Sequence, residues 1–182
     1  TAVGYNALTV NTTGTLNTGL GTFSLDANTT GDNNTAVGYA ALGENTTADN
    51  NTAVGYFALV ANTTGTENVA VGKSAGAALT TGSYNTAVGA SALDVSTTGA
   101  SNVAVGNNAL GANTTSSNNT AVGTDALVVN TAANNTAVGK SALAANTTGT
   151  SNVAVGYATL DANTSADQNT AVGYNALTAA TT

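Results

Sequence analysis

The amino-acid sequence predicts an all-β protein, a parallel β-roll or β-solenoid of about eleven 17-residue coils. Three observations lead to this prediction. One short segment recurs along the chain, each copy alternates small with branched residues, and the 3.6-residue apolar periodicity of a helix is absent. A copy reads "NNTAVGYAALGENTT" at 33–47, and "NNTAVGYFALVANTT" follows at 50–64. Such repeats are typical of solenoids, in which each unit buries its apolar face against its neighbours.

A single repeat array spans residues 1–182, and we number each coil from the Asn that precedes its "TAVG"-like segment. Coils begin at Thr1 (a truncated copy), Asn17, Asn34, Asn51, Asn68, Asn85, Asn102, Asn119, Asn135, Asn152 and Asn169. The spacing is 17 except for 16 between Asn119 and Asn135, and the missing residue falls within 131–135. We predict a loop there, because a one-residue deletion inside a strand would turn every side chain to the other face. We interpret the array as a segment of a longer fibre.

Each coil is predicted to hold two short strands, at positions 2–4 and 6–9, joined by a glycine turn. Position 5 is Gly in every copy, which indicates positive φ or a close backbone approach. These turn glycines are Gly4, Gly21, Gly38, Gly55, Gly72, Gly89, Gly106, Gly123, Gly139, Gly156 and Gly173. A polar "NTT" edge completes the coil. Asn at position 1 and Thr at position 13 are expected to pass hydrogen bonds from coil to coil.

The alternation within positions 2–4 predicts which side chains enter the core. Position 2 exchanges Thr for Val, so we expect it to point inward together with the apolar position 4. Valines at position 4 and leucines at position 9 then form the core: Val37, Leu42, Val54, Leu59, Val71, Val88, Leu93, Val105, Leu110, Val122, Leu127, Val138, Leu143, Val155 and Leu160.

Position 3 would then point outward, yet it is Ala in ten copies and Gly19 in one, which indicates close packing. We therefore expect a chain–chain contact through Ala36, Ala53, Ala70, Ala87, Ala104, Ala121, Ala137 and Ala154. A core of about three apolar side chains per coil is thin, and thin cores are marginally stable. Together these features predict side-by-side assembly, with a homotrimer as the expected state.

The composition argues against catalysis and against several classes of ligand. The chain has no His or Cys, its only cations are Lys73 and Lys140, and its net charge is −7. We expect no enzyme activity and no cofactor, since bases, thiol nucleophiles and arginine clamps are missing. The negative charge disfavours nucleic-acid binding, and no apolar run is long enough to insert into a membrane. Asp32, Asp49 and Glu67 fall close together in successive coils, but a solvated acidic edge is favoured over a Ca²⁺ site.

Tyrosines gather at position 6, directly after the turn. We consider Tyr39, Tyr56, Tyr157 and Tyr174 as candidate contacts for a partner, such as a host-surface protein or glycan. The alternative is that these rings pack on the turn and stack between coils.

"NVAVG" at 68–72, 102–106 and 152–156 and "NTAVGYNAL" at 169–177 resemble the head repeats of YadA-like trimeric autotransporter adhesins. The repeat sequence is also similar to repeats of phage and bacterial tail-fibre proteins. The resemblance implies a left-handed parallel β-roll, three chains side by side, and a place on a bacterial surface or a virion. The expected function is a structural spacer or head segment of an extracellular adhesin or tail fibre. The alternatives are a subunit of a self-assembling filament and an ice-binding solenoid.

Overall fold

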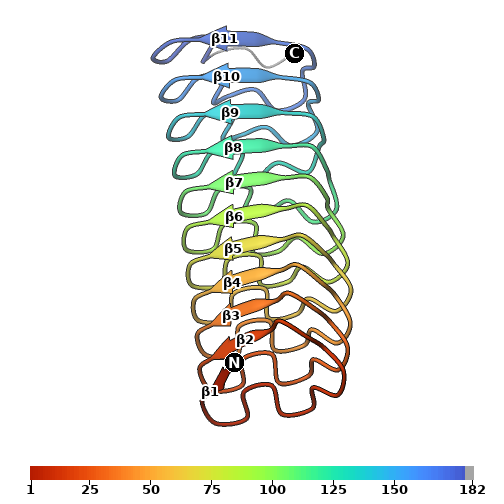
Figure 1. Ribbon diagram of the computed structural model, residues 1–182. Coiled ribbons are helices and arrows are strands. Elements are labelled where there is room, and N and C mark those ends of the chain that lie inside the picture. The colour runs from red at the N-terminus through yellow and green to blue at the C-terminus, as the bar shows by residue number, and fades with distance from the viewer. Residues whose placement is uncertain (179–182) are drawn as a thin grey trace.

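The computed structural model describes residues 1–178 and shows an all-β parallel solenoid with one strand in each coil (Figure 1). The strands are β1 (Ala2–Val3), β2 (Thr18–Leu20), β3 (Thr35–Val37), β4 (Thr52–Val54), β5 (Val69–Val71), β6 (Thr86–Val88), β7 (Val103–Val105), β8 (Thr120–Val122), β9 (Thr136–Val138), β10 (Val153–Val155) and β11 (Thr170–Val172). They form one sheet in chain order, so strand βn belongs to coil n. The predicted fold class, a parallel β-solenoid of 17-residue coils, is confirmed. The last four residues of the array lie outside the described residues.

Every coil pairs with the next at the same repeat position. Ala104 lies opposite Ala121, for example, and this register continues through the short coil, where Thr120 pairs with Thr136. The missing residue therefore falls in the connection after Thr131 and leaves the strands aligned, as predicted. In-register stacking brings chemically identical groups together once per coil, and the hydrogen-bond columns described below depend on it.

The apolar part of the interior is thin and consists mainly of alanines and one leucine per coil. Leu42, Leu59, Leu93, Leu110, Leu127, Leu143 and Leu160 are no more than 1% exposed. They occupy position 9, where the backbone has φ between +48° and +54°. Leucine rarely adopts this left-handed conformation, which costs roughly 1–2 kcal/mol per residue. The conformation directs each leucine into the coil, where burial of the side chain offsets the strain.

The strand faces are the reverse of the prediction. The alanines at position 3 line the interior and are no more than 2% exposed: Ala36, Ala53, Ala70, Ala87, Ala104, Ala121, Ala137 and Ala154. The valines at position 4 lie on the outer face, half-buried or exposed: Val37, Val54, Val71, Val88, Val105, Val122, Val138 and Val155. Predicting these alanines as a chain–chain contact and these valines as core was wrong.

The physical reason for this reversal is the thinness of the interior. A Cβ built on Gly19 would lie 3.1 Å from Ser24 Oγ and 3.4 Å from Leu8 Cγ on the opposite wall. A methyl group therefore fills the space at position 3, and a valine would not fit. The small residues do indicate close packing, but the packing is inside one chain.

The second predicted strand is also absent. Positions 6–9 form turns, with left-handed φ at position 7 as well as at position 9; Phe57 (φ +57°) and Leu59 (φ +48°) are examples. Two left-handed residues in three exclude an extended strand, so each coil has one strand and a chain of turns.

The turn glycine is required for two reasons, which Gly106 illustrates. Its φ is +137°, a value that residues with a Cβ rarely adopt, and a Cβ there would lie 2.5 Å from the carbonyl oxygen of Gly123. Adjacent coils therefore touch backbone to backbone at this corner, which explains why position 5 accepts no side chain.

Asparagine columns run along the inside of the solenoid. At position 1, each side-chain Oδ1 accepts the backbone N–H of the Asn one coil further on, at 2.9–3.0 Å, from Asn17 through Asn169. The predicted Asn column therefore exists, and most of its bonds join side chain to backbone; Nδ2 of Asn85 and of Asn169 also donate to the Oδ1 of the preceding Asn. Threonines at position 13 donate their hydroxyls to the carbonyl of the next coil, as Thr63 does to Thr80 at 3.1 Å.

Candidate functional site

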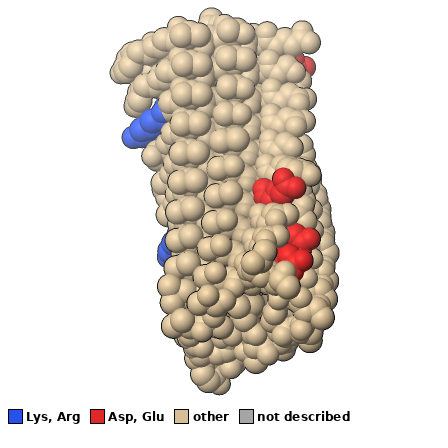
Figure 2. Space-filling view, viewed as in Figure 1, with Lys and Arg blue, Asp and Glu red and all other residues tan. Residues whose placement is uncertain are grey.

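The outer face of the sheet is the most extensive candidate surface. Positions 2 and 4 project from it in two parallel ranks, of Thr or Val in the first and Val or Leu20 in the second. Figure 2 shows this face as regular columns of uncharged atoms, with the charged groups at its two edges. Val71 and Val138 remain 37% and 36% exposed although each is flanked by its neighbours in the rank. The residues of this face stand out in the sequence, but the predicted alternation assigns them to the interior.

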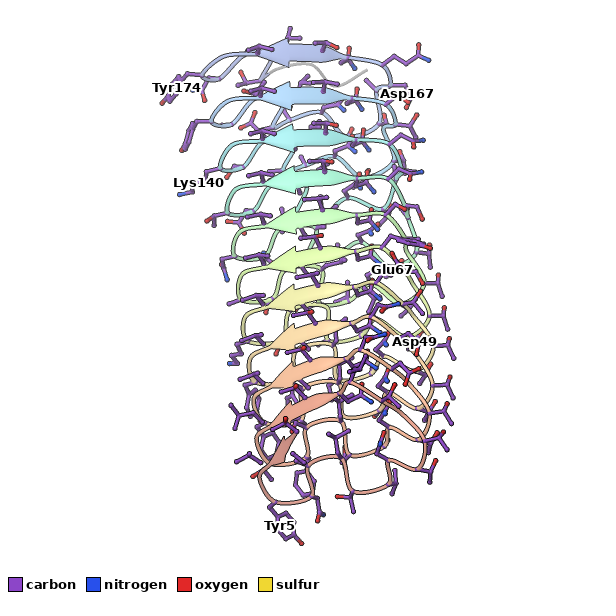
Figure 3. All side chains as sticks on the ribbon, in the orientation of Figure 1. Tyr5, Asp49, Glu67, Lys140, Asp167 and Tyr174 are labelled. Carbon is purple, nitrogen blue, oxygen red and sulfur yellow. The ribbon has the colours of Figure 1, made fainter. Side chains whose placement is uncertain are left out.

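One edge of the face carries aromatic and basic side chains. Position 6 follows the turn glycine and holds Tyr5, Tyr39, Tyr56, Lys73, Lys140, Tyr157 and Tyr174. Figure 3 shows Tyr5, Lys140 and Tyr174 on the same edge of the solenoid. The repeat spacing alone places both cations of the chain in this column, but the partner contacts predicted from the sequence include only tyrosines.

The tyrosines stack between coils and are also exposed. Tyr39 and Tyr56 have ring centroids 5.4 Å apart and planes inclined by 17°, and Tyr157 and Tyr174 are 5.2 Å apart at 11°. Phe57 packs against Tyr56 at 4.3 Å. These tyrosines nevertheless stay 42–76% exposed. Both alternatives for these rings fit the geometry: the ring faces cover one another, while the outer edges and hydroxyls remain open to a partner.

The opposite edge carries carboxylates, and Figure 3 labels Asp49, Glu67 and Asp167 there. At position 16 these carboxylates receive hydrogen bonds from the preceding coil. The backbone N–H and the hydroxyl of Thr15 donate to Asp32 Oδ1 at 2.6 and 2.9 Å and lower the pKa of that carboxyl. Thr150 does the same for Asp167, whose pKa is also lowered.

The backbone N–H of Asp32 in turn donates to Asp49 Oδ1 at 2.7 Å. The carboxylates of Asp32 and Asp49 therefore each accept a backbone N–H of the preceding coil and link neighbouring coils. Among residues 1–178 no three His, Cys, Asp or Glu side chains are grouped to hold a metal ion. The same part of the chain contains no pocket and no helix that would cross a membrane. The surface features that remain are the sheet face and its two edges.

Comparison of the chain with protein-family models, with curated proteins and with solved structures finds no match. The geometry of these surfaces and the resemblance of the repeat are therefore the two guides to function.

Proposed function

We propose that this chain is a structural segment of an extracellular fibre, of the adhesin or tail-fibre type, in which copies pack side by side through the outer sheet face. The observation that carries the proposal is that face itself. Two ranks of methyl-bearing side chains run along the solenoid without a charged residue in β1–β11. Large apolar surfaces on single chains are typical of protein–protein contacts.

The fold suits a spacer. Each coil contacts its two neighbours through backbone hydrogen bonds and side-chain columns, so length grows by one strand spacing of about 4.8 Å for each 17-residue coil. The resemblance to trimeric adhesin heads favours three chains and a left-handed coil, on a bacterial surface or a virion. The segment would hold a binding region away from that surface or form part of it.

Light scattering on the folded protein tests the proposal. We expect a mass three times the 17.4 kDa of one chain. The double variant Val71→Lys/Val138→Lys places charges on the sheet face and should yield single chains with an unchanged β-type circular dichroism spectrum. Val95→Lys/Val129→Lys is the matched control, because these valines are equally exposed, at 39%, but lie at position 11, outside the strands. A single-chain mass for the parent protein would overturn the proposal.

Ice binding is a second candidate, because seven threonines stand in the first rank of the sheet face at regular spacing: Thr18, Thr35, Thr52, Thr86, Thr120, Thr136 and Thr170. Valines interrupt this rank at 69, 103 and 153, and the second rank has no hydroxyl. We therefore expect no thermal hysteresis beyond that of an inert control protein. Shaped ice crystals at micromolar concentration would favour ice binding, and a scattering mass that grows steadily with concentration would favour a filament.

A further inference from the structure

We propose that neighbouring chains meet edge to edge at the same level, with the Tyr/Lys column of one chain against the acidic column of the next. This inference rests on the proposed side-by-side assembly and specifies its contact. The Tyr/Lys column is position 6, and the acidic column is positions 16 and 17. The occupant of each edge is thus a second copy of this chain.

The two edges vary in step along the fibre. Tyr39, Tyr56 and Lys73 lie in coils 3–5, and Asp32, Asp49 and Glu67 lie in coils 2–4. Towards the other end, Lys140, Tyr157 and Tyr174 lie in coils 9–11, and Asp167 lies in coil 10. Each lysine is therefore within one coil, about 4.8 Å of axial height, of a carboxylate on the opposite edge.

At positions 6, 16 and 17 the middle of the solenoid is uncharged, although Asp125 lies at position 7 of coil 8. Position 6 there holds Ala90, Asn107 and Thr124 in coils 6–8. Positions 16 and 17 of the same coils hold Ala100 and Ser101, Ser117 and Asn118, and Ala133 and Asn134. Donors and acids are therefore both absent from coils 6–8 and occupy overlapping stretches of coils on either side, as expected for two surfaces that face one another with an axial offset of no more than about one coil.

The two edges cannot meet inside one chain, because the strand and its turn separate them. Figure 2 shows the lysines on one side of the sheet face and the acids on the other. Such an edge-to-edge contact joins two different surfaces, and contacts of this kind close into rings when the rotation allows. The strands are only three residues wide. When three narrow faces surround a common axis, the left edge of each comes to the right edge of the next.

The chemistry of the edges is complementary. Lysine ammonium groups and phenol hydroxyls are donors, and carboxylates accept from both. Position 16 carboxylates already accept one backbone N–H each, which holds them in place at the edge.

Zero-length carbodiimide cross-linking tests the contact, since it joins lysine only to a carboxylate within direct reach. Unlabelled and ¹⁵N-labelled chains are unfolded together, refolded and cross-linked, and mass spectrometry then identifies peptides of mixed isotope. We expect mixed peptides that join Lys73 to Glu67 and Lys140 to Asp167. A link between Lys140 and Asp125, one coil away at position 7, should form within one chain and serves as the internal control.

Charge reversal gives a second measurement. Lys73→Glu and Glu67→Lys should each weaken assembly by about tenfold or more at low salt, because the pair recurs once per chain–chain contact. The combined variant should recover most of the loss. Asp94→Lys, at position 10, is the control that should leave assembly unchanged.

The outcomes separate this inference from the function on which it rests. A trimer whose mixed-isotope links avoid the two edges, or whose reversals do not compensate, overturns the edge contact alone. A single-chain mass overturns both proposals.

Discussion

Two columns of buried asparagines run through the same interior, but only one of them is asparagine in every full coil. Position 1 is Asn in every coil from Asn17 to Asn169. Position 12 is also mostly Asn, but it becomes Leu79 in coil 5 and Ser96 in coil 6. Where both positions are Asn, the two side chains donate to the same acceptor in their coil, the carbonyl of position 15 or, in the short coil, that of Ala132. In coil 3, for example, Asn34 and Asn45 both donate to the Ala48 oxygen, at 2.8 and 3.1 Å.

The columns differ in what their Oδ1 atoms accept. At position 1 the donor is a backbone N–H, as when Asn119 N donates to Asn102 Oδ1 at 3.0 Å. At position 12 the donor is another side chain, as when Asn45 Nδ2 donates to Asn28 Oδ1 at 2.8 Å. A side chain that is lost from the second column takes its own donor with it. A side chain that is lost from the first column leaves a backbone N–H without a partner, and this group cannot be removed by mutation.

Coils 5 and 6 show that losing the asparagine at position 12 has only a small structural consequence. Asn62 Oδ1 is buried without a hydrogen-bond partner within the described chain. Asn62 lies directly before Leu79 in the column, which offers no donor. Asn113 Oδ1 also lacks a partner, but outside these two coils, because Nδ2 of Asn130 in the short coil 8 donates to the Ala132 oxygen instead. The cost is confined to single side-chain oxygens, and the solenoid continues through both coils in register.

The largest expected effect is therefore at position 1. Asn102 is fully buried, and Asn102→Ala removes both the acceptor of the Asn119 N–H and the donor to the partly buried Ser116 oxygen. An orphaned buried donor and a vacated side-chain volume together should lower the free energy of unfolding by about 3 kcal/mol or more. Urea unfolding at fixed protein concentration measures it. A loss below about 1 kcal/mol would show that position 1 is no more critical than position 12.

Coil 5 provides the next test, because it exchanges two residues of the repeat. Gly76 takes the place of the leucine at position 9, and Leu79 takes the place of the asparagine at position 12, fully buried. We infer that Leu79 fills the volume that position 9 leaves empty. Gly76→Leu alone should overpack the site, and Leu79→Asn alone should leave a void, at a cost of about 1–3 kcal/mol each.

The double variant Gly76→Leu/Leu79→Asn restores the regular coil and supplies a donor for Asn62 Oδ1. We expect a coupling free energy of about 2 kcal/mol in the double-mutant cycle, so that the pair is nearly as stable as the parent. Strictly additive losses would show that the two sites do not share one space.

These columns also show what the repeat reveals and what it conceals. The coil boundaries, the parallel stacking and the loop position of the 16-residue coil follow from spacing alone, because register fixes them. The inward or outward sense of the strand does not. Thr and Val at position 2 and Ala at position 3 satisfy alternation with either face inside. The orientation depends on the thin interior, which has room for little more than a methyl group at position 3, and on the left-handed leucines at position 9. Since leucine disfavours that conformation, the sequence carries no local signal for it.

The candidate surfaces were predictable to a similar extent. Exposure of the tyrosines follows from their place after the turn. The outer sheet face was missed, because the sequence-based alternation placed positions 2 and 4 inside the coil and position 3 outside. The matched variation of the two edges was present in the sequence, but its meaning depends on both columns flanking one face, which only the fold shows.

Asn113→Ala should have a small effect, and it is the matched counterpart of Asn102→Ala in the same coil. Asn113 Oδ1 has no partner to lose, and its Nδ2 shares the Ser116 oxygen with Asn102 Nδ2, each at 2.9 Å. The loss of one shared bond and a side-chain volume should cost about 1 kcal/mol, partly offset because an unpaired buried oxygen is removed. The same urea titration measures it. Equal losses for the two variants would contradict the distinction between backbone and side-chain donors.

The smallest expected effect is at position 16, where side chains also accept backbone N–H groups but do so at the surface. Asp32 and Asp167 are held by Thr15 and Thr150, and their pKa values lie below the usual value of about 3.9. Because the folded-state pKa is the lower one, their contribution is fully present above about pH 4 and is lost as pH falls through the folded-state value. Burial raises the pKa of Asp26, which acts in the opposite sense, so stability gained there on acidification offsets part of the loss. Asp32→Asn/Asp167→Asn keeps an acceptor oxygen but removes the titration, so melting of this variant should depend less on pH between about 4 and 2 than melting of the parent. Asp26→Asn should change the pH dependence in the opposite direction. If acid melting is the same in all three proteins, water replaces the surface acceptor freely, and only the buried columns require their asparagines.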